Sequence, residues 1–292
     1  MNNDIVLIGH ISRDIMIDYE NKESKSIGGA VIYASAAIKA TNLKFTVISK
    51  LPKSEASLKK ELLDSPVNWI IKDSKEMTSI KNQYFSPDKE RRKVKLLSKA
   101  DSFTLEDLDN INSSIFYLAG LFVGEIGDSL IKPLSKRGKV ALDAQGVLRE
   151  SDENGDMNLV DWRNKIDLIP YLTYFKVDAA EAEILTGYSD SEKAIRQIGK
   201  WGAKEVMLTH NTQVMVLSDN KIYYSPYTNK NNSGRTGRGD TTFSSYLAWR
   251  TSHNIEESIK FASTLCSIKM EQPGVFSKTV EDVLKRIKEE KN

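Results

Sequence analysis

The sequence predicts an α/β fold, with a doubly wound, mainly parallel sheet and helices on both faces. Short apolar runs bounded by turn residues alternate with amphipathic stretches along the chain, which is the pattern of such folds. The apolar runs lack the period-two alternation of half-exposed strands, as expected where helices cover both faces of a sheet. The 292 residues, 40% hydrophobic and 28% charged, suit one large domain with a small appendage.

The elements follow in order from these patterns. Buried strands are predicted at residues 5–9, 45–49, 115–119, 140–143, 174–177 and 206–209. Helices are predicted between them, at 30–40, 54–63, 126–135, 179–186 and 191–201. The C-terminal third is predicted to be mostly helical, with helices at 240–250, 255–270 and 278–288.

Two segments break the alternation. Residues 11–17 follow the first strand with little room for a helix, and residues 79–85 and 93–97 form a hairpin pattern around Ser86-Pro87-Asp88-Lys89. Together they predict a small antiparallel sheet, formed by about 11–27 and 78–98, that projects from a single domain spanning residues 1–292. Such a sheet would serve as a lid over a substrate. A surface hairpin or a dimer interface is the alternative.

The bulk composition excludes several partners. The net charge is +2 and the pI about 8.3, and no basic tract is interleaved with aromatic residues, so no nucleic-acid partner is expected. Cys266 is the only cysteine; it precludes an internal disulfide and is expected to be a buried hydrophobe. No apolar stretch approaches the ~20 residues that span a bilayer, and the start shows no basic leader. We expect a cytoplasmic protein without a membrane partner.

A glycine-rich turn at residues 232–243 carries the strongest chemical signal. Gly234, Gly237 and Gly239 let the backbone approach a ligand closely. The first N–H groups of the helix that follows, together with its dipole, form an anion site. Asp240 would repel a phosphate there, so we expect it to take a proton from an attacking hydroxyl. This combination indicates phosphoryl transfer to an alcohol. The simpler reading is a helix cap.

Four blocks of sequence carry a family resemblance. They read GHISRD at 9–14, IGGAVIYA at 27–34, KVDAAEAEILTG at 176–187 and TGRGDT at 236–241. In this order they resemble the ribokinase-like (PfkB) carbohydrate kinase family over nearly the whole chain. The resemblance implies a kinase that uses ATP and Mg²⁺ to phosphorylate a hydroxyl of a small sugar or polyol.

The resemblance implies the catalytic roles in the late block. Asp240 takes the place of the catalytic base, and the backbone N–H groups of Gly237, Arg238 and Gly239 take that of an anion hole. The family usually has a small residue at Arg238, so we expect its side chain in solvent or in a surface salt bridge; the alternative is a positive charge near the phosphates. Gly234 and Arg235 stand where the family often has residues that help to bind a monovalent cation, so dependence on one is left open.

The resemblance also implies an acceptor site. The diglycine Gly28-Gly29 would let a polyol approach the backbone, and Asp14 would accept hydrogen bonds from two of its hydroxyls. Ser12 and Tyr33 stand where family members have Asn, so ribose is not the expected substrate.

Gln145 and Arg149 follow a predicted strand end, where α/β proteins place ligands. We expect Gln145 in the substrate site; for Arg149 a ligand contact and a structural role are equally open. Arg91 and Arg92 in the lid hairpin are expected to be solvated charges; the alternative is that they reach an anionic substrate.

The donor side is implied by the two remaining motifs. Asp178 and Glu181 replace the family's Asn-x-x-Glu and lie a turn apart at a helix start, where they would hold a hydrated Mg²⁺. Thr209 and Asn211 resemble the nucleotide-side Thr-x-Gly turn, in which Asn211 would adopt the left-handed backbone. Thr236, Gly237 and Gly239 complete the expected ATP-binding set. The segment 266–274 is expected to close over the adenine.

Two alternative functions stay open. A nucleoside kinase of the same fold would need an aromatic-lined pocket, to which Tyr33 or Phe85 could contribute. A non-catalytic nucleotide- or sugar-binding regulator is suggested by a set of unusual residues: Gly234, Arg235, Arg238, Asp178 and Asn211. Because an exposed lid sheet gains by pairing with a second copy, a homodimer through the lid is the expected assembly.

Overall fold

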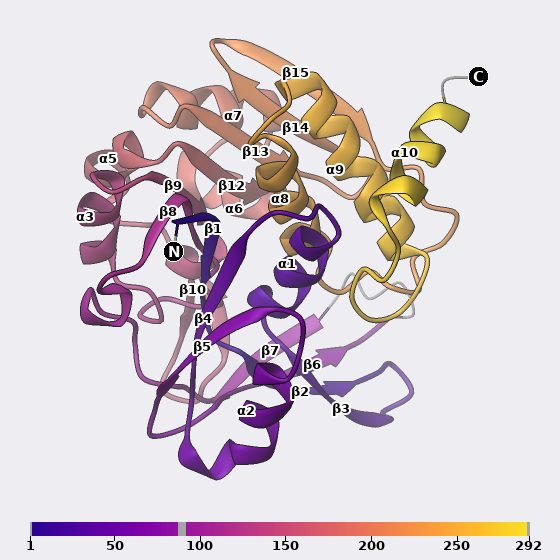
Figure 1. The fold of residues 1–292 in the computed structure, drawn as a ribbon. Helices are drawn as coiled ribbons and strands as arrows, with labels where there is room; N and C mark the ends of the chain where they lie inside the picture. Colours follow the sequence, from indigo (N-terminus) through magenta and orange to yellow (C-terminus); the bar gives the residue numbers. More distant parts are fainter. Residues whose placement is uncertain (1, 87–91, 291–292) are drawn as a thin grey trace.

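The computed structural model describes residues 2–86 and 92–290, and its centre is a nine-stranded sheet (Figure 1). The strands are β1 Asn2–Ile8, β4 Phe45–Leu51, β5 Asn68–Asp73, β8 Asn112–Leu118, β9 Lys139–Asp143, β12 Tyr174–Asp178, β13 Glu205–Thr209, β14 Gln213–Ser218 and β15 Lys221–Pro226. Their order is β15-β14-β13-β12-β9-β8-β1-β4-β5. Neighbours from β5 to β13 pair in parallel, and the β13–β14 and β14–β15 pairs are antiparallel. The predicted, mainly parallel sheet is confirmed.

Helices cover both faces of this sheet. They include α1 Ala30–Lys39, α2 Ala56–Leu63, α3 Ile131–Ser135, α6 Ala179–Thr186, α7 Ser191–Lys200, α8 Arg238–Trp249, α9 Ile255–Met270 and α10 Val280–Glu289. On β1, Ile5 and Leu7 enter one core with residues of α1, α8 and α9, whereas Val6 and Ile8 enter the other with residues of α3, α6 and α7. Because both sets of side chains are buried, the strand reads as a continuous apolar run. Among the described residues, no helix is long and apolar enough to cross a bilayer.

The hairpin of β14 and β15 and the strand β5 were not predicted. The hairpin turn is Asp219-Asn220, and both residues have positive φ, 47° and 63°. This is the geometry of a tight two-residue hairpin turn, which favours Asn and Asp. The C-terminal third is therefore less purely helical than expected.

The predicted small sheet is present and stands apart from the main one (Figure 1). Its strands are β2 Ser12–Ile17, β3 Glu23–Gly28, β6 Thr78–Tyr84 and β7 Arg92–Ser98, in the order β3-β2-β6-β7. The outer pairs are antiparallel, as expected, but the central pair of β2 and β6 is parallel. Residues 87–91 of the link between β6 and β7, Arg91 among them, lie outside the described residues.

The small sheet leaves some apolar side chains exposed, among them Ile27 and Leu97. A homodimer formed through this sheet stays a prediction.

Candidate functional site

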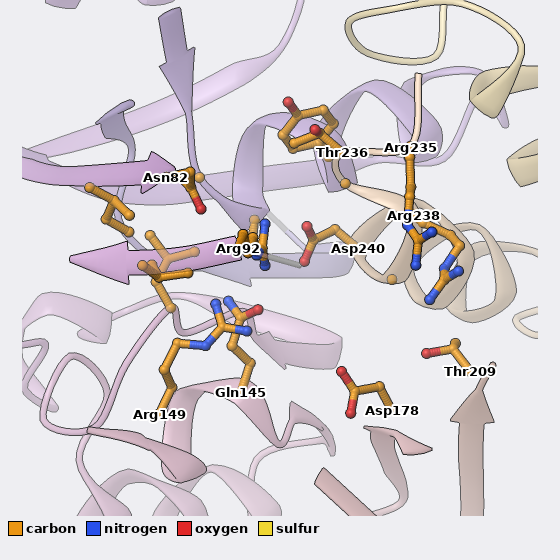
Figure 2. A pocket seen from close by; sticks show the side chains of 18 of the residues that line it. Asn82, Arg92, Gln145, Arg149, Asp178, Thr209, Arg235, Thr236, Arg238 and Asp240 are labelled. Carbon is orange, nitrogen blue, oxygen red and sulfur yellow. The ribbon is translucent and has the colours of Figure 1, made fainter. Parts of the chain in front are cut away.

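A cavity of about 480 Å³ opens between the small sheet and the ends of the central strands (Figure 2). Its walls come from β2, β6 and β7 on one side, and from the ends of β12 and β13 and the start of α8 on the other. It brings together most residues that the sequence singled out: Ser12, Asp14, Gly29, Tyr33, Gln145, Asp178, Thr209, Asn211, Thr236, Gly237, Arg238, Gly239 and Asp240. Gly28, which precedes Gly29 in the chain, and Glu181 are not among the residues that line the cavity. The carboxyl ends of parallel strands are where open α/β sheets bind ligands.

The start of α8 has the backbone that an anion hole needs. Gly237 precedes the helix with φ 79°, a left-handed conformation that favours glycine. A Cβ on Gly237 would lie only 2.3 Å from the ring of Tyr33, so this position also has no room for a side chain. The Arg238 N–H does not face the cavity as expected, because it donates to the carbonyl of Arg235 (3.2 Å).

Asp240 stands in the first turn of α8 and lines the cavity. Burial and the neighbouring Asp143 carboxylate raise its pKa to about 6, against the lowering effect of Lys176, Arg149 and Lys269. A carboxylate with this pKa is ionised at neutral pH and is a stronger base than an ordinary aspartate. Its position and its pKa both suit proton abstraction from a bound hydroxyl.

A buried lysine, Lys176, influences the charge of Asp240. Lys176 Nζ lies 3.0 Å from Asp143 Oδ1 and 3.6 Å from Glu181 Oε2. Burial by itself would lower the pKa of Lys176, but the two carboxylates raise it above its ordinary value. A side chain on Gly239 would begin 3.2 Å from the same ammonium. Sequence reasoning missed Lys176, because a lysine inside an apolar strand carries no local sign of its partners.

The expected metal pair forms a capping box at the start of α6. Asp178 accepts a hydrogen bond from the Glu181 N–H, and Glu181 accepts one from the Asp178 N–H. Glu181 is buried, and burial raises its pKa to about 7 although Lys176 lowers it. Only Asp178 lines the cavity. Within the described residues, no group of three candidate ligands could hold a metal ion.

The end of the cavity at which we expect the acceptor to bind is built on β2 and the diglycine. Ser12 Oγ donates to Asp14 Oδ1 (2.7 Å), and burial raises the pKa of Asp14. A Cβ on Gly28 would lie 2.2 Å from Asp14 Oδ2, so the diglycine makes room for this carboxylate. Gly29 has φ 104°, and a Cβ there would meet the carbonyl of His10 at 2.4 Å.

Strand β6 adds lining residues that were not predicted. Its buried positions alternate, and Ile80, Asn82 and Tyr84 of this face line the cavity. Asn82 is a buried amide on a face otherwise suited to apolar contacts, and the period-two pattern could have revealed it. Arg92 of β7 also lines the cavity, although it was expected to be only a solvated charge.

Gln145 and Arg149 extend into the cavity side by side (Figure 2). Gln145 Nε2 donates to the Gly120 carbonyl at 3.5 Å. Burial lowers the pKa of the Arg149 guanidinium, and so does the nearby Arg92. The two side chains place an amide and a positive charge between the acceptor end and Asp240.

The opposite end of the cavity holds two arginines. Arg235 Nη2 and Arg238 Nη1 both donate to Asn211 Oδ1, at 2.9 and 3.1 Å. The Arg238 side chain is half-buried and lines the cavity. Asn211 does not use the left-handed backbone that we expected; its side chain orients the guanidinium groups instead.

Thr209 and Thr236 also line this end, whereas no residue of segment 266–274 does. Closure of this segment over an adenine stays a prediction. Cys266 is fully buried, as expected.

The chain is similar to several known proteins. The profile of the pfkB family carbohydrate kinase matches residues 2–282. A pyrophosphate-dependent kinase in the ribokinase family, complexed with a pyrophosphate analog and myo-inositol, is 33% identical, with 97% of this chain and 99% of that chain covered and a TM-score of 0.88. A pyrophosphate-dependent myo-inositol-1 kinase converted into a myo-inositol-3 kinase by a double substitution is 32% identical, with 98% and 99% covered and a TM-score of 0.87.

A more distant structure shares the fold. The ribokinase of Arabidopsis thaliana, complexed with ribose and ATP, is 17% identical, with 99% of each chain covered and a TM-score of 0.75. No curated protein matches the chain.

Proposed function

This chain belongs to the PfkB family of carbohydrate kinases and is a phosphotransferase with an alcohol group as acceptor, and we propose that it phosphorylates a cyclic polyol of the inositol class with pyrophosphate as the donor. The observation that carries the donor assignment is the pair of arginines, Arg235 and Arg238, held by Asn211 at one end of the cavity. The relatives at 32–33% identity support both parts of the proposal.

The donor argument rests on charge. Pyrophosphate has no nucleoside to bury, so its affinity must come from cations and backbone N–H groups that contact its oxygens. Guanidinium groups suit this role because they form strong, directional hydrogen bonds to phosphate. Arg235 and Arg238 lie where a second phosphate would extend beyond the start of α8, and no residue of segment 266–274 lines this cavity. ATP, the donor expected from the sequence, is the alternative outcome of the test.

The acceptor argument rests on the distribution of polar groups. Asp14, Asn82, Gln145 and Arg149 reach the cavity from both sides, and a ring that carries a hydroxyl on every carbon can bond to all of them. A nucleoside would instead need aromatic walls. Phe85 does not line the cavity, whereas Tyr33 and Tyr84 do, and the ring of Tyr33 packs against Gly237.

The proposed reaction uses these groups in line. The acceptor oxygen forms a bond to one phosphorus of pyrophosphate while the bond from that phosphorus to the bridging oxygen breaks. Asp240 takes the hydroxyl proton, and inorganic phosphate leaves with the bridging oxygen. The N–H groups of Gly237 and Gly239 stabilise the charge on the transferring group. Arg235 and Arg238 hold the departing phosphate.

Mg²⁺ fits this site through one carboxylate. Asp178 lines the cavity and has one oxygen outside its capping bond, which would hold the ion together with donor oxygens and water. Glu181 is committed to Lys176 and to the Asp178 N–H. When bound, Mg²⁺ neutralises charge on the donor phosphates.

The test compares pyrophosphate and ATP as donors over a panel of inositols, pentoses, hexoses and nucleosides, with the phosphorylated product identified by ³¹P NMR. We expect pyrophosphate to support transfer to an inositol with a far higher kcat/KM than ATP. Replacement of Arg238 by Gln should raise KM for pyrophosphate about tenfold or more, the loss expected for a hydrogen bond to a charged group. The inositol KM should change little.

The matched control is Arg196→Gln, which removes an exposed arginine of α7 that bonds only to the Asn220 carbonyl. It should leave both KM values unchanged. Preference of the wild type for ATP, or an unchanged KM for pyrophosphate in Arg238→Gln, would overturn the donor assignment. Transfer to sugars or nucleosides but not to inositols would overturn the acceptor assignment.

A further inference from the structure

Lys269 holds the loop that leads into the anion hole. The residue lies in the last turn of α9 and is only 3% exposed. Its ammonium donates to the carbonyl of Gly234 at 2.5 Å and also to the carbonyl of Thr236. These two residues stand immediately before Gly237, so a positive charge is bound by main-chain oxygens directly behind the phosphate site.

The surroundings of Lys269 have the character of a cation site. Gly234 packs against the end of α9, where its N–H donates to the Met270 carbonyl (2.8 Å) and a Cβ would meet the Gln272 carbonyl at 1.8 Å. The carboxyl end of a helix carries partial negative charge. The carbonyls of the helix end lie close to Gly234, and the carbonyls of Gly234 and Thr236 accept hydrogen bonds from the Lys269 ammonium. Carbonyl oxygens are also ligands by which proteins bind K⁺.

The ammonium is also linked to the shape of the hole. Lys269 Nζ lies 5.0 Å from the centre of the Tyr33 ring, and this ring packs on Gly237. The Lys269 ammonium thus contacts both the loop that precedes Gly237 and the Tyr33 ring that packs on Gly237. The same charge lowers the pKa of Asp240.

We propose that the Lys269 ammonium is a built-in monovalent cation, which performs for the anion-hole loop what a bound K⁺ or NH₄⁺ ion would otherwise perform. A lysine ammonium is a compact charge with three donors, and it matches a free ammonium ion in chemistry. Gly234 has no side chain and the side chain of Arg235 is a cation, so neither position offers a carboxylate for a free metal ion. The consequence is a kinase whose loop is ordered without any added monovalent cation.

The first experiment measures the wild type in the chlorides of K⁺, NH₄⁺, Na⁺ and tetramethylammonium at equal ionic strength. Transfer rates and melting temperatures should be the same in all four salts. Activation specific to K⁺ or NH₄⁺ in the wild type would overturn the proposal, because it would require an unfilled cation site.

The second experiment replaces Lys269 by Met, which keeps the length of the chain and removes the charge. Transfer should fall about 10²-fold, as when one donor of an oxyanion hole is lost. K⁺ and NH₄⁺ should restore a large part of the rate in a saturable manner and should raise the melting temperature. Na⁺ and tetramethylammonium should do neither. The melting readout needs no substrate, so it stands whichever donor the enzyme uses.

Lys260→Met is the matched control. Lys260 lies on the same helix, and its replacement removes an ion pair with Glu290 (2.6 Å). It should show no response that is specific to K⁺ or NH₄⁺. Full activity of Lys269→Met, or a variant that neither melts higher nor recovers activity in K⁺ and NH₄⁺, would show that Lys269 serves packing alone. A variant that folds in none of the four salts would count against the proposal in the same way.

Discussion

Lys176 places its ammonium 3.0 Å from the carboxylate of Asp143, and both side chains are buried. The pair lies beside Asp240, whose pKa Asp143 raises and Lys176 lowers. Two charges of opposite sign therefore act on the proposed base together, and the loss of either should move its titration in a known direction.

Replacement of Lys176 by Met should destabilise the protein and raise the pKa of the proposed base. The change leaves Asp143 and Glu181 buried without their cation, which typically costs about 3–5 kcal/mol. The pKa of Asp240 should rise above about 6, so the pH midpoint of activity should move upward. Chemical denaturation and a pH–rate profile measure the two effects. Lys221→Met, which removes an exposed ion pair with Glu256, should change neither; an unmoved midpoint in Lys176→Met would contradict the assigned role.

The activity of the wild type should fall as the pH decreases through about 6, the raised pKa of Asp240. Below this pKa the carboxylate is protonated and cannot accept the hydroxyl proton; above it the base is available. Phosphate groups titrate in the same range, with a pKa of about 6. Donor binding should therefore be measured by calorimetry at each pH. A kcat that stays constant down to pH about 4, near the ordinary range of an aspartate, would exclude Asp240 as the titrating base.

Asp240→Asn should lower kcat by about 10²–10⁴-fold, the contribution typical of a positioned general base. The amide has nearly the same shape but cannot take the proton, so donor binding should persist. Single-turnover rates and donor titrations distinguish the two effects. Turnover near that of the wild type would sink the proposed mechanism.

Gly237→Ala should lower the stability of the protein by more than backbone strain alone explains, and it should also lower the activity. A non-glycine residue at φ 79° costs about 1–3 kcal/mol, and the new Cβ would also clash with Tyr33. Gly187→Ala is the control, because Gly187 has φ 75° and nothing within 4 Å of a Cβ. Equal losses of stability in the two variants would show that the Tyr33 contact does not matter; we expect the larger loss, together with lost activity, at Gly237.

The central strands could be predicted from the sequence because their burial on both faces leaves a local mark. Val206 and Leu208 enter one core while Met207, between them, enters the other, so the run is apolar throughout. The hairpin of β14 and β15 also carried a local signal, Asp219-Asn220, which could have been recognised. Asn82 could likewise have been found from the alternation of β6.

Other parts of the site could not be predicted in this way, because they depend on contacts distant in sequence. The direction of the Arg238 side chain is set by Asn211, 27 positions earlier. The contact of Lys269 with Gly234 spans 35 positions. Nothing in the sequence near one residue of each pair marks the position of the other. The general tendency of arginine and lysine to face solvent therefore could not predict either contact.

The dependence of the anion-hole loop on α9 also bears on how the protein is made. A growing chain exposes the complete glycine motif before Lys269 and Met270 have been synthesised. Until those residues arrive, Gly234 lacks the carbonyl that receives its N–H, and Thr236 lacks its ammonium donor. Because chains begin to fold from the N-terminal side during synthesis, the acceptor end of the cavity can form first and the donor end last. A nascent chain should thus acquire phosphoryl transfer only after Lys269 and Met270 have been added and can fold.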